Sequence, residues 1–113
     1  MSAPHNRADL FLLKPGFEDP AFPDAIYFDR FSALLEGVLR SFPELERRMV
    51  VHHVDFARPR VAVAALAGED NQTLPRLVLP PGVASGHASA EHEGRRSVAG
   101  AAAIIAALVE LYG

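Results

Sequence analysis

Histidine and carboxylate side chains gather in one short stretch of this chain, and residues of these types could hold a metal ion. The stretch lies between Gly86 and Gly94 and contains His87, Glu91 and His92. Imidazole and carboxylate groups are common ligands of zinc and similar ions. Their spacing matches no zinc-site signature, and a metal site needs ligands that further contacts hold in place. The flanking glycines therefore favour a solvated loop, and we predict no metal site here.

Two more histidines, His52 and His53, are neighbours in a stretch rich in valine. Such a stretch predicts a strand, in which successive side chains point to opposite faces. The two imidazoles therefore cannot hold one metal ion together. We expect one of them to be packed and the other to be partly exposed.

The sequence contains no cysteine. This excludes disulfides, thiolate nucleophiles, iron–sulfur clusters and zinc sites with cysteine ligands. Redox chemistry of any kind would need a bound cofactor, and we predict that the protein binds no cofactor.

Charged residues follow two of the predicted strands. Lys14, Glu18 and Asp19 come after the first strand, and Arg58 and Arg60 come after the second. Open α/β sheets usually bind ligands at this edge. The pattern fits a polar groove, but solvated charges around the ends of strands would look the same, so both interpretations stay open.

Length and composition indicate one globular domain, because the 113 residues are half hydrophobic and 22% charged. The basic residues are scattered along a chain of net charge -3, which does not indicate a nucleic-acid partner. Residues 1–9 lack the apolar core of a secretory signal. The longest nearly apolar stretch, residues 97–109, is shorter than the about 20 residues that cross a bilayer. We therefore expect a cytoplasmic protein without a membrane partner.

The clearest predicted element is a helix that follows Asp29. Its apolar residues recur at helical spacing and form a single stripe. The stripe consists of Phe31, Leu34, Leu35, Val38, Leu39 and Phe42. Asp24 and Asp29 are candidate caps, and Pro43 ends the helix, with one further turn over residues 44–48. An anion assisted by Arg30 could bind the free N–H groups at the start, but an aspartate cap satisfies the same donors and is favoured.

The remaining pattern is that of an α/β domain. Strands are predicted at residues 10–13, 49–56, 76–79 and 95–99, and further helices at residues 59–66 and 101–112. We expect residues 1–8 to form a polar N-terminal segment, residues 17–23 an ordered loop, and residues 80–95 a long loop between the third and fourth strands. The first two strands are expected to be parallel, since the helix after Asp29 supplies the crossover that such a pair requires.

This order of elements matches the minimal thioredoxin-like, or glutaredoxin-like, arrangement βαβαββα, with a four-stranded mixed sheet flanked by helices. Several phrases also resemble a bacterial family of thioredoxin-like proteins with no assigned function. These phrases are Leu12-Leu13-Lys14-Pro15-Gly16-Phe17-Glu18-Asp19-Pro20, Leu35-Glu36-Gly37, Phe42-Pro43, Arg58-Pro59-Arg60 and Asn71-Gln72-Thr73-Leu74-Pro75. The resemblance implies a single thioredoxin-like domain over residues 1–113.

The resemblance also implies where a ligand would bind. The catalytic Cys-x-x-Cys of thioredoxin-like enzymes corresponds to Phe28-Asp29-Arg30-Phe31, so thiol-disulfide oxidoreductase activity is excluded. The cis-proline that faces this motif corresponds to the Leu74-Pro75 bond. The residues implied to form the ligand-binding groove are Tyr27, Phe28, Asp29, Arg30, Phe31, Leu74 and Pro75.

The favoured hypothesis is a redox-inactive module whose groove binds a peptide, a protein or a small ligand. One alternative is an enzyme like the glutathione transferases that uses Tyr27 or Ser32 to activate a thiol. Residues 98–101, where such folds hold glutathione, lack the usual acidic residue and serine. Another alternative is the metal site at His87 and His92. A homodimer through the C-terminal helix or an edge strand also stays open.

Overall fold

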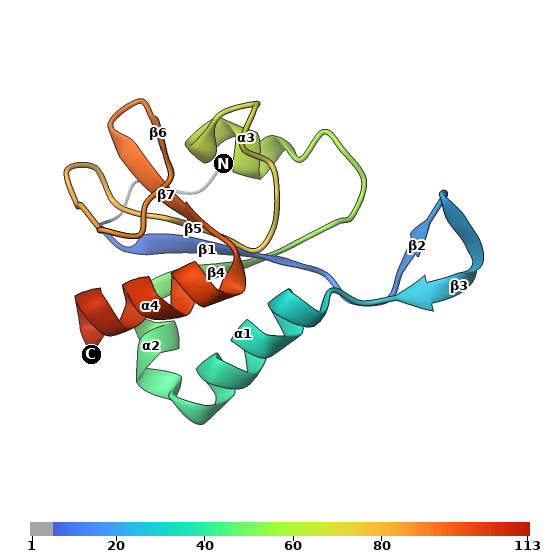
Figure 1. The fold of residues 1–113 in the computed structure, drawn as a ribbon, viewed down its shortest axis with the longest axis horizontal. Helices are drawn as coiled ribbons and strands as arrows, with labels where there is room; N and C mark the ends of the chain where they lie inside the picture. The colour runs from blue at the N-terminus through green and yellow to red at the C-terminus, as the bar shows by residue number, and fades with distance from the viewer. Residues whose placement is uncertain (1–5) are drawn as a thin grey trace.

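A computed structural model describes residues 6–113 of the chain (Figure 1). Its centre is a five-stranded mixed sheet with the strand order β4-β1-β5-β7-β6. The strands of this sheet are β1 (Ala8–Leu13), β4 (Met49–Val54), β5 (Arg76–Val78), β6 (Ala90–His92) and β7 (Arg95–Ala99). The first strand pairs with β4 in parallel and with β5 antiparallel, while β7 is antiparallel to both β5 and β6. The predicted parallel pair is thus confirmed.

Helices cover both faces of the sheet. They are α1 (Arg30–Ser41), α2 (Pro43–Arg47), α3 (Val61–Ala67) and α4 (Ala101–Tyr112). Figure 1 shows α1, α2 and α4 on one face and α3 on the other. Within residues 6–113 no helix has the length and apolar character needed to span a membrane.

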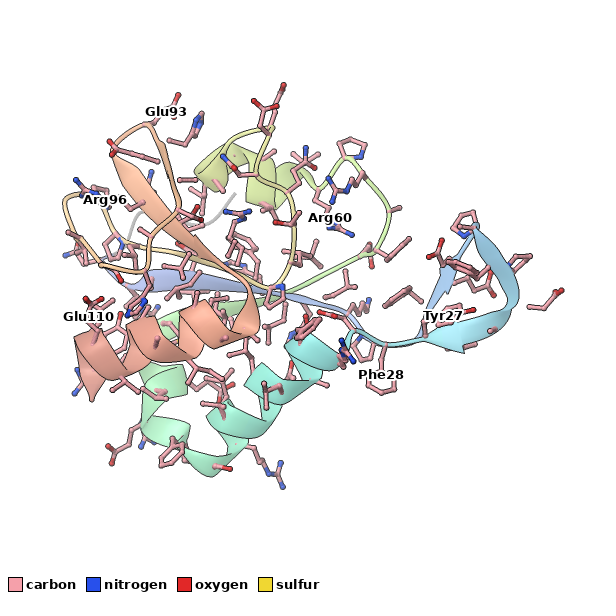
Figure 2. The ribbon with its side chains drawn as sticks, in the orientation of Figure 1. Tyr27, Phe28, Arg60, Glu93, Arg96 and Glu110 are labelled. Atoms are coloured by element: carbon pink, nitrogen blue, oxygen red, sulfur yellow. The ribbon has the colours of Figure 1, made fainter. Side chains whose placement is uncertain are left out.

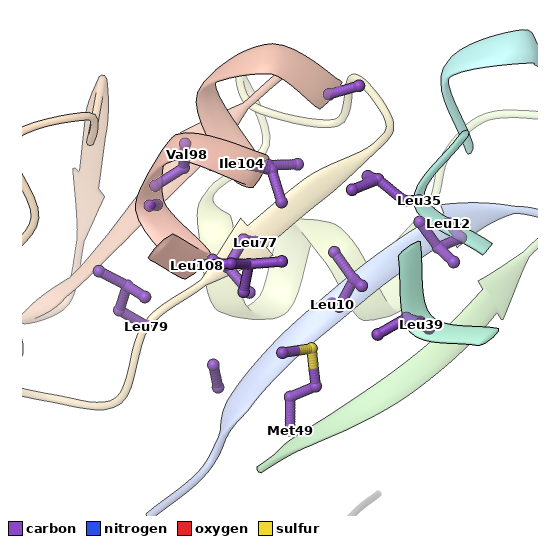
Figure 3. Packing of buried hydrophobic residues seen from close by; sticks show 13 residues of the cluster. Leu10, Leu12, Leu35, Leu39, Met49, Leu77, Leu79, Val98, Ile104 and Leu108 are labelled. Atoms are coloured by element: carbon purple, nitrogen blue, oxygen red, sulfur yellow. The ribbon is translucent and has the colours of Figure 1, made fainter. Parts of the chain in front are cut away.

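The core is built around β1, in which every residue is buried. Because side chains alternate along a strand, Leu10 and Leu12 pack toward α1 and α4, whereas Phe11 packs toward α3. Figure 3 shows Leu10 and Leu12 among residues such as Leu35 and Ile104. With both faces covered, the strand reads as a continuous apolar run rather than an alternating one.

A two-stranded hairpin projects from the body, at a place where the sequence analysis predicted a loop over residues 17–23. Its strands are β2 (Phe17–Asp19) and β3 (Phe22–Tyr27). The Asp19 side chain closes the turn by accepting a hydrogen bond from the backbone N–H of Ala21 at 3.0 Å. Pro23 fits in β3 because a strand with a free edge does not need every N–H. We call residues 17–27 the arm.

The predicted long loop over residues 80–95 is wrong in its last part, which forms the fifth strand, β6. His92 pairs with Arg95 across a two-residue turn made by Glu93 and Gly94. Both turn residues have positive φ, +49° and +82°, as the tight turns that match the twist of a hairpin require. Glutamate seldom adopts this conformation, so the turn could not be predicted from local residue preferences.

The predicted ends of two other elements also change. The helix predicted over residues 59–66 begins at Val61, because Arg60 is its N-cap and has a non-helical backbone conformation, φ -95° and ψ 83°. The predicted polar N-terminal segment over residues 1–8 lies mostly outside the described residues, and Ala8 already belongs to β1. The helix after Asp29 and the extra turn after Pro43 are confirmed as α1 and α2.

Candidate functional site

A groove of about 460 Å³ lies between the arm and the body, beside the start of α1. Five of its lining residues are aromatic: Phe17, Phe22, Tyr27, Phe28 and Phe56. Thr73 and Leu74, which immediately precede β5, line it as well, together with the cations Arg58 and Arg60. Two carboxylates, Asp19 and Asp29, complete its polar lining. The groove therefore combines aromatic surface with charge.

The structure brings four of the seven predicted groove residues together. Tyr27, Phe28, Asp29 and Leu74 line the groove, and Figure 2 shows Tyr27 and Phe28 at the root of the arm, next to α1.

The other three predicted residues lie outside this lining. Arg30 stacks on Phe31, with its guanidinium carbon 4.8 Å from the ring centroid, and both side chains are exposed. Pro75, the residue after Leu74, is buried. The Leu74-Pro75 bond is cis, as predicted.

Asp29 is the N-cap of α1, as the favoured interpretation had it. Its carboxylate accepts hydrogen bonds from the backbone N–H groups of Phe31 (3.4 Å) and Ser32 (3.0 Å) and from the Ser32 hydroxyl (2.7 Å). The buried Ser32 hydroxyl in turn accepts from the backbone N–H of Leu13 at 3.0 Å. These contacts join the start of α1 to the end of β1, and the cap uses the donors that an anion would need.

We expect Asp29→Ala to lower the free energy of unfolding by about 1–2 kcal/mol, because it removes the cap and a partner of the buried Ser32 hydroxyl. Urea denaturation followed by circular dichroism measures this change. Asp24→Asn is the matched control: Asp24 is exposed in the arm with φ +71°, which asparagine also tolerates. Equal losses for the two variants would contradict the assigned cap.

Arg60 is a buried cation, only 8% exposed, that fixes the loops on two sides of the groove. Its guanidinium donates to the carbonyl oxygens of Phe56 (2.6 Å) and Gln72 (2.8 Å). Burial, and then the nearby charge of Arg58, lower the pKa of Arg60 from its usual value. Its Nε has no hydrogen-bond partner within residues 6–113. The guanidinium thus keeps one donor unsatisfied beside the groove.

The arginines of the groove form no ion pairs with its carboxylates. Within the described chain no carboxylate lies within ion-pair distance of Arg58 or Arg60. The carboxylate of Asp29 is engaged by the start of α1, and that of Asp19 by the turn of the arm. Arg58 is exposed and remains available to a carboxylate of a ligand.

The aromatic residues give the groove its shape. The rings of Phe17 and Phe56 stack with centroids 4.5 Å apart, and this contact joins the arm to the loop after β4. Tyr27 tilts against Phe17 at 6.2 Å, and its hydroxyl donates to the carbonyl oxygen of Phe22 at 3.3 Å. Phe28 is 66% exposed at the opening. Flat apolar surfaces of this kind suit an aromatic or aliphatic side chain of a ligand.

Sequence reasoning identified part of this site and missed the rest. It placed Arg58, Arg60 and Asp19 at the same edge of the sheet, and the groove unites them. It missed Phe17, Phe22, Phe56 and Thr73, whose positions depend on the unpredicted hairpin and on loops. The recurrence of phenylalanine on both sides of the arm turn was the available signal.

The histidines do not form a metal site within residues 6–113, where no three side chains of histidine or acidic residues come together as ligands. Glu91 lies 3.9 Å from Arg96, and His92 lies 3.8 Å from its neighbour Glu93. His52 and His53 point to opposite faces as predicted. His52 stacks on Phe11 and contacts Asp9 at 2.8 Å, and the exposed His53 contacts Glu36.

Comparison with known proteins adds a family but no activity. No curated protein and no solved structure matches the chain. Residues 7–113 match the family described as "Protein of unknown function (DUF3088)". Because this match covers nearly the whole sequence, the chain belongs to the DUF3088 family of proteins of unknown function.

Proposed function

We propose that this protein is a redox-inactive, thioredoxin-like module that binds an extended peptide segment with an acidic side chain in the groove. The observation that carries the proposal is the lining itself, which combines five aromatic residues with two arginines that pair with no carboxylate in residues 6–113. Carboxylates are the usual partners of such guanidinium groups. An acidic side chain of a ligand would therefore give the exposed Arg58 an ion-pair partner.

The sheet supports the thioredoxin-like part of the proposal. Without the arm, the short helix α2 and β6, the elements follow the order β1, α1, β4, α3, β5, β7, α4, which is the predicted βαβαββα. The four strands lie in the order β4-β1-β5-β7, with one parallel and two antiparallel pairs. The start of α1 and the residues before β5 meet at one edge of this sheet, where the groove is.

The backbone next to β5 favours a peptide over other ligands. The turn, loop and cap hydrogen bonds of residues 6–113 do not include the backbone of Leu74. An extended peptide can pair with such free N–H and C=O groups, while its side chains enter neighbouring pockets. Leu74 and Arg58 line the same groove, so one short segment could use both.

The absence of cysteine sets the chemical limit of this function. Phe28 and Phe31 stand at the start of α1, and neither can form a thiolate or a mixed disulfide. Binding in this groove would thus occur without thiol exchange.

The test is a pair of capped hexapeptides that differ only in charge, Gly-Asp-Phe-Glu-Phe-Gly and Gly-Lys-Phe-Lys-Phe-Gly, titrated into ¹⁵N-labelled protein. We expect the acidic peptide to shift the amide resonances of Phe28, Thr73 and Leu74, and the basic peptide to shift them far less. In Arg58→Glu the preference should fall by about tenfold or reverse, because opposite charges attract. The exposed variant Arg40→Glu, on the far end of α1, is the control.

Three outcomes would contradict the proposal. They are an absence of shifts at millimolar peptide, equal shifts with both peptides, and a response that Arg58→Glu leaves unchanged. Glutathione in the same titration tests the transferase alternative. Amide shifts around Tyr27 and Leu74 that are larger with glutathione than with the acidic peptide would favour that alternative.

A further inference from the structure

The arm makes few contacts with the rest of the structure. It projects away from the sheet and helices (Figure 1), and every residue from 20 to 26 is exposed. Its connection to the body is at its root, where Phe17 stacks on Phe56 and the backbone N–H of Gly16 donates to the carbonyl oxygen of Tyr27. The tip of the arm therefore receives little support from the body.

A hairpin of two strands is at best marginally stable in water unless further strands or a helix cover it. The arm also holds large apolar side chains in solvent, since Phe22 is 62% and Ile26 is 66% exposed. Both observations indicate that another surface covers the arm.

The charge of the arm indicates which surface that is. The arm contains Glu18, Asp19 and Asp24 and no basic residue. Two arms packed on each other alone would bring carboxylates together, which is unfavourable. The groove of another copy offers the exposed cation Arg58, together with aromatic surface for Ile26.

The groove that receives the arm cannot be the one in the same chain. The arm forms a wall of its own groove through Phe17, Phe22 and Tyr27, and its root is fixed there. A second copy can supply its arm instead, and exchange in both directions produces a closed two-fold dimer.

We propose that this chain forms a homodimer in which the arm of each copy docks in the groove of the other. This inference rests on the proposed function, because it names the acidic segment that the groove binds. Ile26 and Glu18 of one copy lie against the aromatic residues and Arg58 of its partner. Other acidic peptides then compete with the arm of the partner.

Sedimentation equilibrium of charge variants tests the exchange. We expect Glu18→Lys and Arg58→Glu each to raise the dimer dissociation constant by about tenfold or more. The double variant Glu18→Lys/Arg58→Glu restores opposite charges between arm and groove and should recover much of this loss. Glu46→Lys, an exposed change on α2, is the control and should have no effect. Ile26→Ser should weaken the dimer as well, and thermal melting of each variant verifies that it is folded.

A synthetic peptide of residues 16–28 separates this inference from the proposed function. Added to the Ile26→Ser variant, it should shift the amides of Phe28, Thr73 and Leu74, and added to the wild type it should dissociate the dimer. A wild type that is monomeric up to about 1 mM would overturn the dimer. If the acidic hexapeptide still binds such a monomer, the proposed function survives alone. A dimer that is insensitive to all three arm and groove variants would also overturn the exchange.

Discussion

Replacing Arg76 by alanine is expected to lower the free energy of unfolding by about 3 kcal/mol. Arg76 lies on β5 and is only 3% exposed. Its guanidinium donates to the hydroxyl of Ser97 (2.9 Å) and to the hydroxyl (2.8 Å) and carbonyl oxygen (3.2 Å) of Thr73. Alanine leaves these acceptors without their donor and opens a cavity in the sheet, and both changes destabilise the folded state.

The same change should also disturb the groove. Burial disfavours the charged guanidinium and lowers the pKa of Arg76. The three acceptors that surround the guanidinium offset this cost. Two of its three hydrogen bonds hold Thr73, which is next to Leu74 in the wall of the groove. Arg76→Lys keeps the charge but cannot place donors in the same planar geometry, so it should recover only part of the lost stability.

Urea denaturation of Arg76→Ala, Arg76→Lys and Arg96→Ala measures these differences. Arg96→Ala is the matched control because Arg96 is on the neighbouring strand and its side chain is 39% exposed. Within residues 6–113 the one ion pair of this side chain is with Glu91 at 3.9 Å. Its loss should stay within about 0.5 kcal/mol. Comparable losses for Arg96→Ala and Arg76→Ala would contradict the role given to the buried guanidinium.

The elements with strong local patterns could be predicted from the sequence. Asp29 and Pro43 mark the limits of α1 because capping and the proline ring act over a few residues. The valines of β4 and the apolar run of β1 indicate strands with both faces covered, and the helix between them supplies the crossover that a parallel pair requires.

The arm and β6 could not be predicted, because neither follows these patterns. Pro20 and Pro23 interrupt the arm and argue against strands, yet β3 tolerates Pro23 where no partner strand needs its N–H. The turn before β7 depends on a glutamate with positive φ, which pairing with β7 imposes and local preference does not.

The candidate site was predictable to the extent that it depends on the ends of elements. Tyr27, Phe28, Asp29 and Leu74 come together because the start of α1 and the residues before β5 meet at one edge of the sheet. Arg60 was expected only as a charged residue at the edge of the sheet. Its burial follows from hydrogen bonds to loop carbonyl groups that are far apart in the sequence, and no local pattern encodes them.

The apolar stripe of α1 shows a second limit of sequence reasoning. Six residues were predicted to form one apolar face, but only Leu35 and Leu39 of this stripe are buried. Phe31, Leu34 and Phe42 are 46%, 51% and 62% exposed. Periodicity gives the direction of the face but not the width that the sheet and α4 cover. Neighbouring leucines of this helix should therefore differ greatly in their contribution to stability.

Leu35→Ala is expected to lower the free energy of unfolding by about 3 kcal/mol, whereas Leu34→Ala should cost less than about 1 kcal/mol. Leu35 is 0% exposed and packs in the main core, so its truncation leaves a cavity that the surrounding strands cannot fill. The two variants share the same helix, the same chemistry and nearly the same helix propensity, so Leu34→Ala is a close control. Denaturation midpoints at constant slope measure both. Similar losses would mean that α1 is rotated about its axis relative to the sheet, and this would also displace Phe28 and Asp29 from the groove.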